Sequence, residues 1–235
     1  MDSTIDILDR HYADQLGCGP GDFSSGRVVV VANDRVAEIL FAKGIPLALF
    51  GICKPSGTVI AARELLALVV ERVVREVNAS DLSEPLCAAI REAVDPLVSA
   101  KEWFRGLRLY CSPETFADRQ FGEARDVTDC DEEAAQIHRK WGGRVFGQVV
   151  DSEVVAWCGI KPLSEVAWDL TVKTHPDHRG KGYAKSAVSA AVKHIFANGK
   201  LATWGTDLWN EASMRTARSV GFSDYGLDFG CVEEQ

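Results

Sequence analysis

Residues 166–197 join three patterns in one segment, and this combination limits the folds open to the chain. Residues 166–174 alternate between apolar and polar side chains, as a half-buried strand does. A turn with two glycines follows, and residues 183–197 then have the period of an amphipathic helix. The apolar residues of that helix form one face: Ala184, Ala187, Val188, Ala191, Val192 and Ile195. Because this face is rich in alanine, we expect the helix to approach a sheet closely.

The segments around this unit predict further strands and helices. Residues 144–150 and 153–161 alternate as a hairpin around Asp151-Ser152. A strand and a helix are expected before it, at 122–129 and 131–140, and a strand, a helix and a strand after it, at 201–208, 211–220 and 222–229. Antiparallel strands followed by strand–helix–strand–helix–strand predict an α+β fold, with a mixed, mostly antiparallel sheet and flanking helices.

The first half of the chain has a different character. All six tryptophans lie after residue 100, and a turn signal at 111–114 follows a strand-like stretch at 107–110. We therefore predict a smaller N-terminal α+β domain, 1–115, and a second domain, 116–235. The elements expected in the first domain are a helix at 5–16, strands at 27–32, 47–52 and 58–61, and helices at 63–77 and 84–98.

Charge and cysteine usage exclude several classes of protein. The chain has 26 Lys and Arg against 34 Asp and Glu, a net charge of −8, which disfavours nucleic-acid binding and mildly favours cationic partners such as amines. The seven cysteines are scattered and form no Cys-x-x-Cys pair, so neither a zinc ribbon nor a disulfide framework is expected. Without a signal peptide or an apolar run of membrane-spanning length, we expect a cytoplasmic protein with no membrane partner.

The strongest local signal is residues 178–184, His-Arg-Gly-Lys-Gly-Tyr-Ala, between the strand and the helix. The first N–H groups of a helix have no internal partner, and the helix dipole adds positive charge there. Gly180 and Gly182 allow close backbone approach, while Arg179 and Lys181 add charge, so the turn suits a pyrophosphate. The P-loop and dinucleotide fingerprints are both absent. A purely structural glycine turn remains the alternative.

Arg179-x-x-Gly182-x-Ala184, after a strand and before an amphipathic helix, resembles the acyl-CoA-binding motif of the GNAT (GCN5-related N-acetyltransferase) superfamily. Residues 172–177, Val-Lys-Thr-His-Pro-Asp, are similar to the end of the family's fourth strand. Asn210 and the later Gly221-Phe222 are similar to a second family motif. The resemblance covers residues 122–229 and three motifs in the family's order.

The resemblance implies acetyl-CoA as the acyl donor. In the family, two splayed strands hold the pantetheine arm, and amides at the start of the following helix hold the pyrophosphate. The cofactor-binding residues that it implies are Val172, Thr174, Arg179, Gly180, Lys181, Gly182, Tyr183, Ala184, Lys185 and Asn210. For Asn210, an N-cap of the next helix is a compatible structural role.

The reaction implied by the resemblance is direct attack of a primary amine, on a small molecule or a peptide, on the thioester. The backbone N–H near Val172 would stabilise the oxyanion. Asp169 and Glu165 are the carboxylates on or beside the fourth strand, and they are the candidates for the catalytic base. A salt-bridged structural role for Asp169 stays open.

The sequence departs from the family at the usual proton donor. Ala217 occupies the position where a tyrosine often protonates the leaving thiolate, and neither Tyr183 nor Tyr225 matches that motif. A non-catalytic acyl-CoA-binding module is therefore the main alternative function, and a phosphate-binding protein unrelated to CoA is a third. The loop interpretation already accounts for His175 and His178, so no metal site is expected.

The N-terminal domain offers no catalytic motif of its own. Its strand–turn–strand–helix content is compatible with a degenerate copy of the GNAT fold, as in some two-domain members of the family. Such a domain would shape the acceptor pocket or form the contact of a homodimer.

Overall fold

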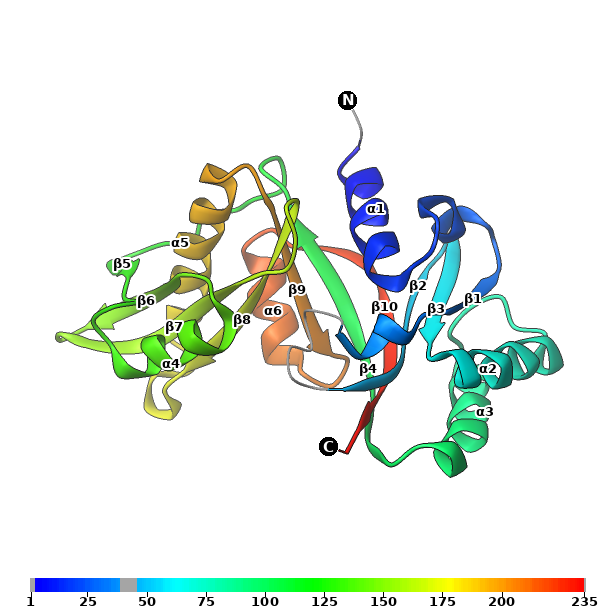
Figure 1. The fold of residues 1–235 in the computed structure, drawn as a ribbon. Coiled ribbons are helices and arrows are strands. Elements are labelled where there is room, and N and C mark those ends of the chain that lie inside the picture. Colours follow the sequence, from blue (N-terminus) through cyan, green and yellow to red (C-terminus); the bar gives the residue numbers. More distant parts are fainter. Residues whose placement is uncertain (1–2, 39–45, 235) are drawn as a thin grey trace. The chain divides into compact units, whose positions relative to one another are not determined.

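The computed structural model describes residues 3–38 and 46–234 (Figure 1). The chain divides into a first unit, Met1–Arg108 with Tyr225–Gln235, and a second unit, Leu109–Asp224. This division lies a few residues before the boundary expected from the sequence, and it assigns the C-terminal strand to the first unit. Helices and strands combine in both units, which confirms the predicted α+β class.

The first unit is built on a mixed sheet with the strand order β1-β3-β2-β10-β4. Strand β1 is parallel to β3, whereas β3 and β10 are both antiparallel to β2. Its elements are α1 (Thr4–Leu16), the 3-10 helix η1 (Pro20–Ser24), β1 (Val28–Ala32), η2 (Asp34–Glu38), β2 (Leu47–Lys54), β3 (Gly57–Ala62), α2 (Glu64–Val77), α3 (Glu84–Val94), η4 (Asp95–Leu97), β4 (Ala100–Cys111) and β10 (Ser223–Glu233).

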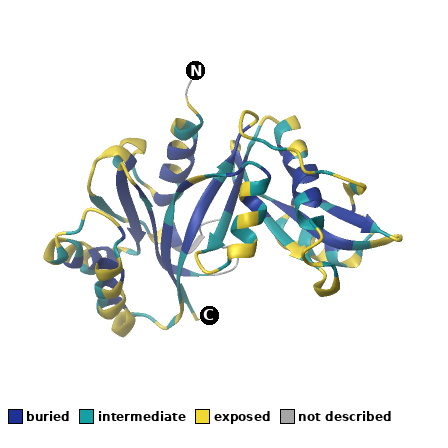
Figure 2. Ribbon diagram, turned by 180° about the vertical axis from the view of Figure 1, so that it is seen from behind, coloured by how far each residue is buried: buried dark blue, intermediate teal, exposed yellow. Residues whose placement is uncertain are grey.

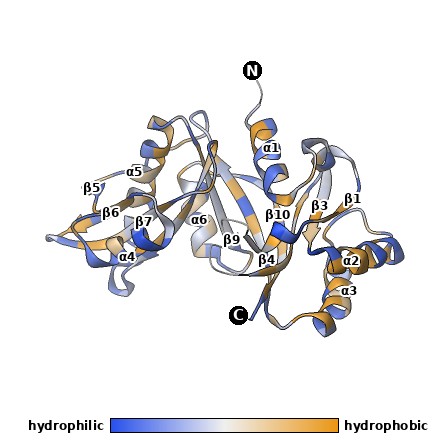
Figure 3. Cartoon of the chain, in the orientation of Figure 1, coloured by the Kyte–Doolittle hydropathy of each residue, from blue (hydrophilic) through white to orange (hydrophobic). Residues whose placement is uncertain are grey.

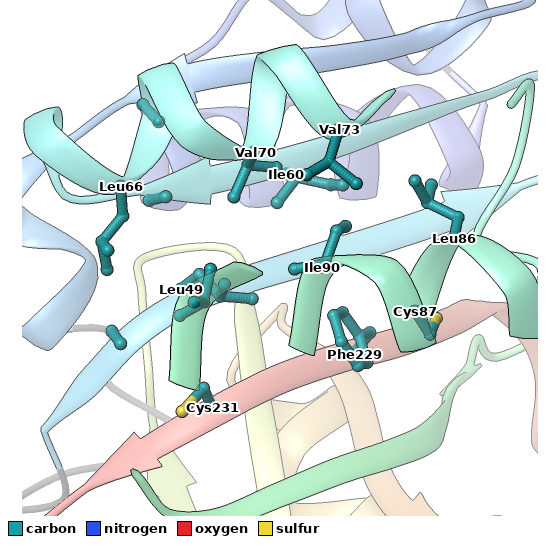
Figure 4. Packing of buried hydrophobic residues seen from close by; sticks show 14 of the residues in the cluster. Leu49, Ile60, Leu66, Val70, Val73, Leu86, Cys87, Ile90, Phe229 and Cys231 are labelled. Atoms are coloured by element: carbon teal, nitrogen blue, oxygen red, sulfur yellow. The ribbon is translucent and has the colours of Figure 1, made fainter. Parts of the chain in front are cut away.

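Two amphipathic helices close the core of the first unit. Apolar and polar residues are interspersed along α2 and α3 in Figure 3. The buried apolar residues, such as Leu66 of α2 and Ile90 of α3, pack in the core, whereas Leu65 and Leu68 of α2 are exposed. Figure 4 shows side chains of α2, α3, β2, β3 and β10 packed together, among them Leu66, Ile90, Leu49, Ile60 and Phe229. Because β10 contributes Phe229 and Cys231 to this core, the C-terminal residues fold with the N-terminal ones.

The second unit has the strand order β9-β8-β7-β6-β5, antiparallel except for the pair β8–β9. The hairpin β6–β7 turns at Asp151 and Ser152, which both have positive φ (50° and 69°), as a two-residue hairpin turn requires. The elements are β5 (Glu123–Asp126), α4 (Glu132–Trp141), β6 (Val145–Val150), β7 (Glu153–Pro162), β8 (Ala167–Thr174), η5 (Pro176–His178), α5 (Tyr183–Ala197), β9 (Leu201–Asp207) and α6 (Glu211–Ser219).

Helix α5 is the helix predicted at 183–197, and it is buried on more than one side (Figure 2). Every residue of its predicted apolar face except Ala184 is fully buried. Ser186 and Ser189 are buried as well, because their hydroxyls bond the backbone of the crossing segment 119–121. Among the described residues, no helix is long and apolar enough to span a membrane.

Candidate acyl-donor site

The parallel strands β8 and β9 separate along their length. Their paired positions are Ala167↔Leu201, Trp168↔Ala202 and Asp169↔Thr203. Both strands continue beyond the last pair, β8 to Thr174 and β9 to Asp207. The C-terminal halves of the two strands therefore leave one edge of β8 without a partner from β9.

Two hydrogen bonds fix the direction of the backbone groups along β8. The His175 N–H donates to the Val155 carbonyl of β7 (2.9 Å), and the Leu201 N–H donates to the Val166 carbonyl (2.9 Å). Because backbone groups alternate in direction along a strand, even-numbered residues of β8 point toward β9. The N–H and C=O groups of Val172 and Thr174 thus face the opening between the strands.

The loop after β8 turns through two glycines before α5. Gly180 and Gly182 have φ values of 76° and 84°, a region that other residues adopt only with strain. Gly182 is the N-cap of α5 and supplies no side chain to bond the first N–H groups. Within the described part of the chain, no hydrogen bond is made to the backbone N–H groups of residues 180–185.

The loop also carries unbalanced positive charge. Arg179 and Lys181 are exposed and Lys185 is partly buried. None of the three forms an ion pair with another described residue, and the first turn of α5 contains no acidic side chain. Free N–H groups, the helix dipole and three cations together form a candidate anion site, called the anion site below, with the features that favour phosphate groups.

Phe121 borders this loop, and no local pattern in the sequence points to it. Its backbone N–H and carbonyl both bond the Ser186 hydroxyl (3.0 Å each). Its ring lies 5.8 Å from the Tyr183 ring and 3.6 Å from the position that a Cβ on Gly182 would occupy. Since the ring is 46% exposed, it forms an apolar wall at the mouth of the anion site.

Asp169 is held in a buried ion pair at the point where β8 and β9 separate. The residue is 2% exposed, and its Oδ2 lies 3.3 Å from Lys161 Nζ. The Thr203 hydroxyl donates to Oδ1 at 3.5 Å, and the Lys161 ammonium also lies 4.6 Å from the centre of the Trp141 ring. Both carboxylate oxygens of Asp169 are engaged, as in the structural role that the sequence left open.

Glu165 is not brought to the loop. Its side chain is fully exposed and lies 3.4 Å from Lys200 Nζ, in the turn before β8 begins. The anion site follows the other end of β8, so eight strand residues, roughly 25 Å, separate the two.

The residues of the second family motif occupy the start and end of α6. Asn210 is the N-cap, and its Oδ1 accepts from the Ser213 N–H (3.1 Å). Ala217 is fully buried. Gly221 has a φ of 99°, and a Cβ at this position would lie 2.0 Å from the Thr115 carbonyl oxygen. Because the backbone at Thr115 passes so close, only glycine fits at position 221.

The Tyr225 hydroxyl and the Cys158 thiol are both buried groups. Tyr225 belongs to the first unit, where its hydroxyl donates to Asp9 Oδ1 (2.7 Å). Burial and the Asp9 carboxylate raise the pKa of Tyr225 above its usual range. Burial likewise raises the pKa of the Cys158 thiol.

No group of three or more His, Cys, Asp or Glu residues among 3–38 and 46–234 could hold a metal ion.

Comparison with known proteins agrees with this geometry. Residues 105–222, half of the chain and nearly the whole second unit, match the model of the acetyltransferase (GNAT) family. A GNAT-family acetyltransferase from Colwellia psychrerythraea has the same fold (TM-score 0.50, 13% identity, covering 100% of this chain and 98% of the other).

Two more solved structures are similar at lower scores. A GCN5-related N-acetyltransferase-like protein from Streptococcus suis gives a TM-score of 0.48 (13% identity, 97% and 99% covered). A GCN5-related N-acetyltransferase from Kribbella flavida gives 0.47 (16% identity, 61% and 63% covered). No curated protein matched the chain. The family match and the separated strands beside a glycine-rich helix start lead to one conclusion: the chain belongs to the GNAT family of acetyltransferases.

Proposed function

We propose that the protein transfers an acetyl group from acetyl-CoA to a primary amine by direct attack on the thioester. The observation that carries this proposal is the opening between β8 and β9 next to six unbonded N–H groups at the start of α5. Acetyl-CoA is the acyl donor of this family, and its extended pantetheine arm and pyrophosphate have complementary partners in these two features.

The donor would lie with its pyrophosphate on the N–H groups of residues 180–185. Arg179, Lys181 and Lys185 supply charge beside them, and no acidic residue of the first helical turn opposes it. The pantetheine arm would follow the free edge of β8 and bond the backbone of Val172 and Thr174 as an added strand does. Asn210, three residues after the end of β9, would contact the arm while it caps α6.

The chemistry follows from this placement. A primary amine has a pKa near 10, so it must lose a proton before its lone pair attacks the carbonyl carbon. The N–H of Val172 faces the opening and can donate to the oxyanion that forms. As the C–S bond breaks, the attacking nitrogen loses its second proton, and the electron pair leaves on the CoA sulfur, which takes up a proton.

Departure of the thiolate needs little acid assistance. A thiol of pKa about 8.5 is a far better leaving group than an amine, so protonation of sulfur is not the difficult step. This agrees with Ala217 at the position of the family's tyrosine and with the engagement of the Tyr225 hydroxyl by Asp9. Asp169, paired with Lys161, would stabilise the junction of β8 and β9 rather than accept the proton.

The alternative is a module that binds acyl-CoA without turnover, which the absence of the tyrosine at Ala217 favours. Two measurements separate the alternatives: calorimetric titration with CoA, and release of CoA thiol from acetyl-CoA with a panel of primary amines. We expect binding and amine-dependent release. Binding without release for any amine would favour the module, and absence of CoA binding would contradict both.

A further inference from the structure

Alternation along β8 and β9 defines which side chains share the face of the sheet covered by α4. Lys173 Nζ lies 2.7 Å from Glu133 of α4, so odd-numbered residues of β8 point to that face. The Trp168 ring instead lies near His194 of α5, on the opposite face. Because Thr203 pairs with Asp169 and bonds it, the odd-numbered residues of β9 share the α4 face.

Asp207 is the last residue of β9, and by this alternation its carboxylate lies on the α4 face. The register Asp169↔Thr203 places Asp207 at the level of Lys173, next to the opening between the strands. Val172, whose N–H faces that opening, is one residue before this level. A carboxylate at this position is adjacent to the point where a thioester held along β8 would react.

Asp207 differs from the other carboxylates near the site in having no partner within the described part of the chain. Asp169 pairs with Lys161, Glu133 with Lys173, and Glu211 with Arg215. The side chain of Asp207 forms no hydrogen bond or ion pair with any residue that the structure describes, although the residue is partly buried. A partly buried carboxylate is costly without a charged partner, so this position favours binding of a cationic group from a ligand.

The residues after Asp207 add apolar surface beside this charge. Leu208 is 40% exposed and Trp209 is 79% exposed, an unusual degree of exposure for an indole. An indole next to a carboxylate favours a ligand that joins an ammonium group to an apolar body.

We propose that Asp207 binds the ammonium group of the acceptor and accepts its proton, while Trp209 contacts the acceptor's apolar part. This inference rests on the proposed function, because it needs acetyl-CoA between β8 and β9. The ammonium loses one proton to Asp207, directly or through one water. The nitrogen lone pair then forms the C–N bond, the nitrogen loses a second proton to solvent, the C–S bond breaks, and the CoA sulfur takes up a proton from solvent. The acceptor class is therefore a primary amine with an apolar or aromatic substituent.

The test compares Asp207→Asn with Asp151→Asn in assays of CoA-thiol release. Asp151 also lacks a described partner and is exposed, in the β6–β7 turn, where Asn tolerates its positive φ. The acceptors are 2-phenylethylamine and n-butylamine. We expect kcat/KM of Asp207→Asn to fall by about 10²–10⁴ at pH 7, with CoA affinity unchanged. The loss should shrink as the pH approaches 10, where the free amine no longer needs a base. Asp151→Asn should keep the wild-type rate.

Trp209→Ala supplies a second readout on the acceptor class. It should raise KM for 2-phenylethylamine several-fold more than KM for n-butylamine. Equal rates for wild type and Asp207→Asn, or a deficit that does not change with pH, would overturn the role of Asp207 while leaving the proposed function intact. A wild-type protein that binds CoA but acetylates neither amine would also contradict the inference. Failure to bind CoA would instead contradict the proposed function.

Discussion

The anion site depends on the backbone conformation of single residues. Gly180 and Gly182 reach positive φ in the loop, and the N–H groups of residues 180–185 form no hydrogen bond with any described residue. A Cβ added to Gly180 would have no atom within 4 Å, so the space beside this residue, where a ligand would lie, is open. The strain that another residue would suffer is about 1–2 kcal/mol, small enough to leave the protein folded.

Replacing Gly182 with alanine separates strain from binding when Gly199→Ala serves as the control. Gly199, after the other end of α5, also has positive φ (67°) and open space around it. Both variants should lose about 1–2 kcal/mol of unfolding free energy in urea titrations. Only Gly182→Ala should lose CoA affinity in calorimetry, by about tenfold or more, because its methyl group meets the ligand. Equal CoA affinity for the two variants would remove the loop from the donor site.

The strand pair β8–β9 is the element on which the site depends. Three paired positions hold the strands together before they separate, and the buried Asp169–Lys161 pair lies at the last of them. A buried ion pair contributes little net stability, but removal of one partner leaves an uncompensated charge. The geometry of the opening therefore relies on both partners remaining present.

Asp169→Asn should destabilise the protein by a few kcal/mol, because the Lys161 side chain is only 14% exposed and its ammonium would lose its partner. The double variant Asp169→Asn with Lys161→Met should recover most of that loss in chemical denaturation. It should also retain amine-dependent release of CoA. A double variant that is stable but inactive would show instead that Asp169 takes part in proton transfer.

Elements with a strong local pattern could be predicted from the sequence, and features formed by distant residues could not. Helix α5 begins and ends where its period indicated. Strand β4 extends over twelve residues rather than 107–110, because Lys101, Glu102 and Arg105 break the apolar alternation of a strand that is exposed at its start. The burial of Ser189 depends on Arg119, seventy positions earlier, and no local pattern reports such a contact.

For the molecule as a whole, the chain returns at its end to the unit in which it began. Strand β10 pairs with β2, and Tyr225 at the start of this segment bonds Asp9 of α1. Lys54 of β2 completes the buried group, with its ammonium 2.5 and 2.7 Å from the Asp9 oxygens. The tryptophan distribution and the turn signal at 111–114 placed this strand in the second expected domain, 116–235. The pairing with β2 is a long-range contact.

Tyr225 should make the first unit sensitive to alkaline pH. Burial and Asp9 raise the pKa of the phenol above its unfolded value near 10. The stabilisation is therefore complete below pH 10 and is lost as the pH rises above it. Tyr225→Phe should lose about 1–2 kcal/mol at neutral pH and show a weaker decline above pH 10, with CoA-thiol release nearly unchanged. Urea titrations at several pH values measure both effects. An unchanged alkaline decline in Tyr225→Phe would assign it to other groups.

The most direct test of the central claim is amide hydrogen exchange with and without CoA. If the N–H groups of residues 180–185 bind the pyrophosphate, and those of Val172 and Thr174 face the pantetheine arm, exchange at these positions should slow sharply when CoA is present. Exchange along α2 and α3 of the first unit should not change. Protection by CoA that appears elsewhere and leaves residues 172–185 unaffected would contradict the proposed acyl-donor site.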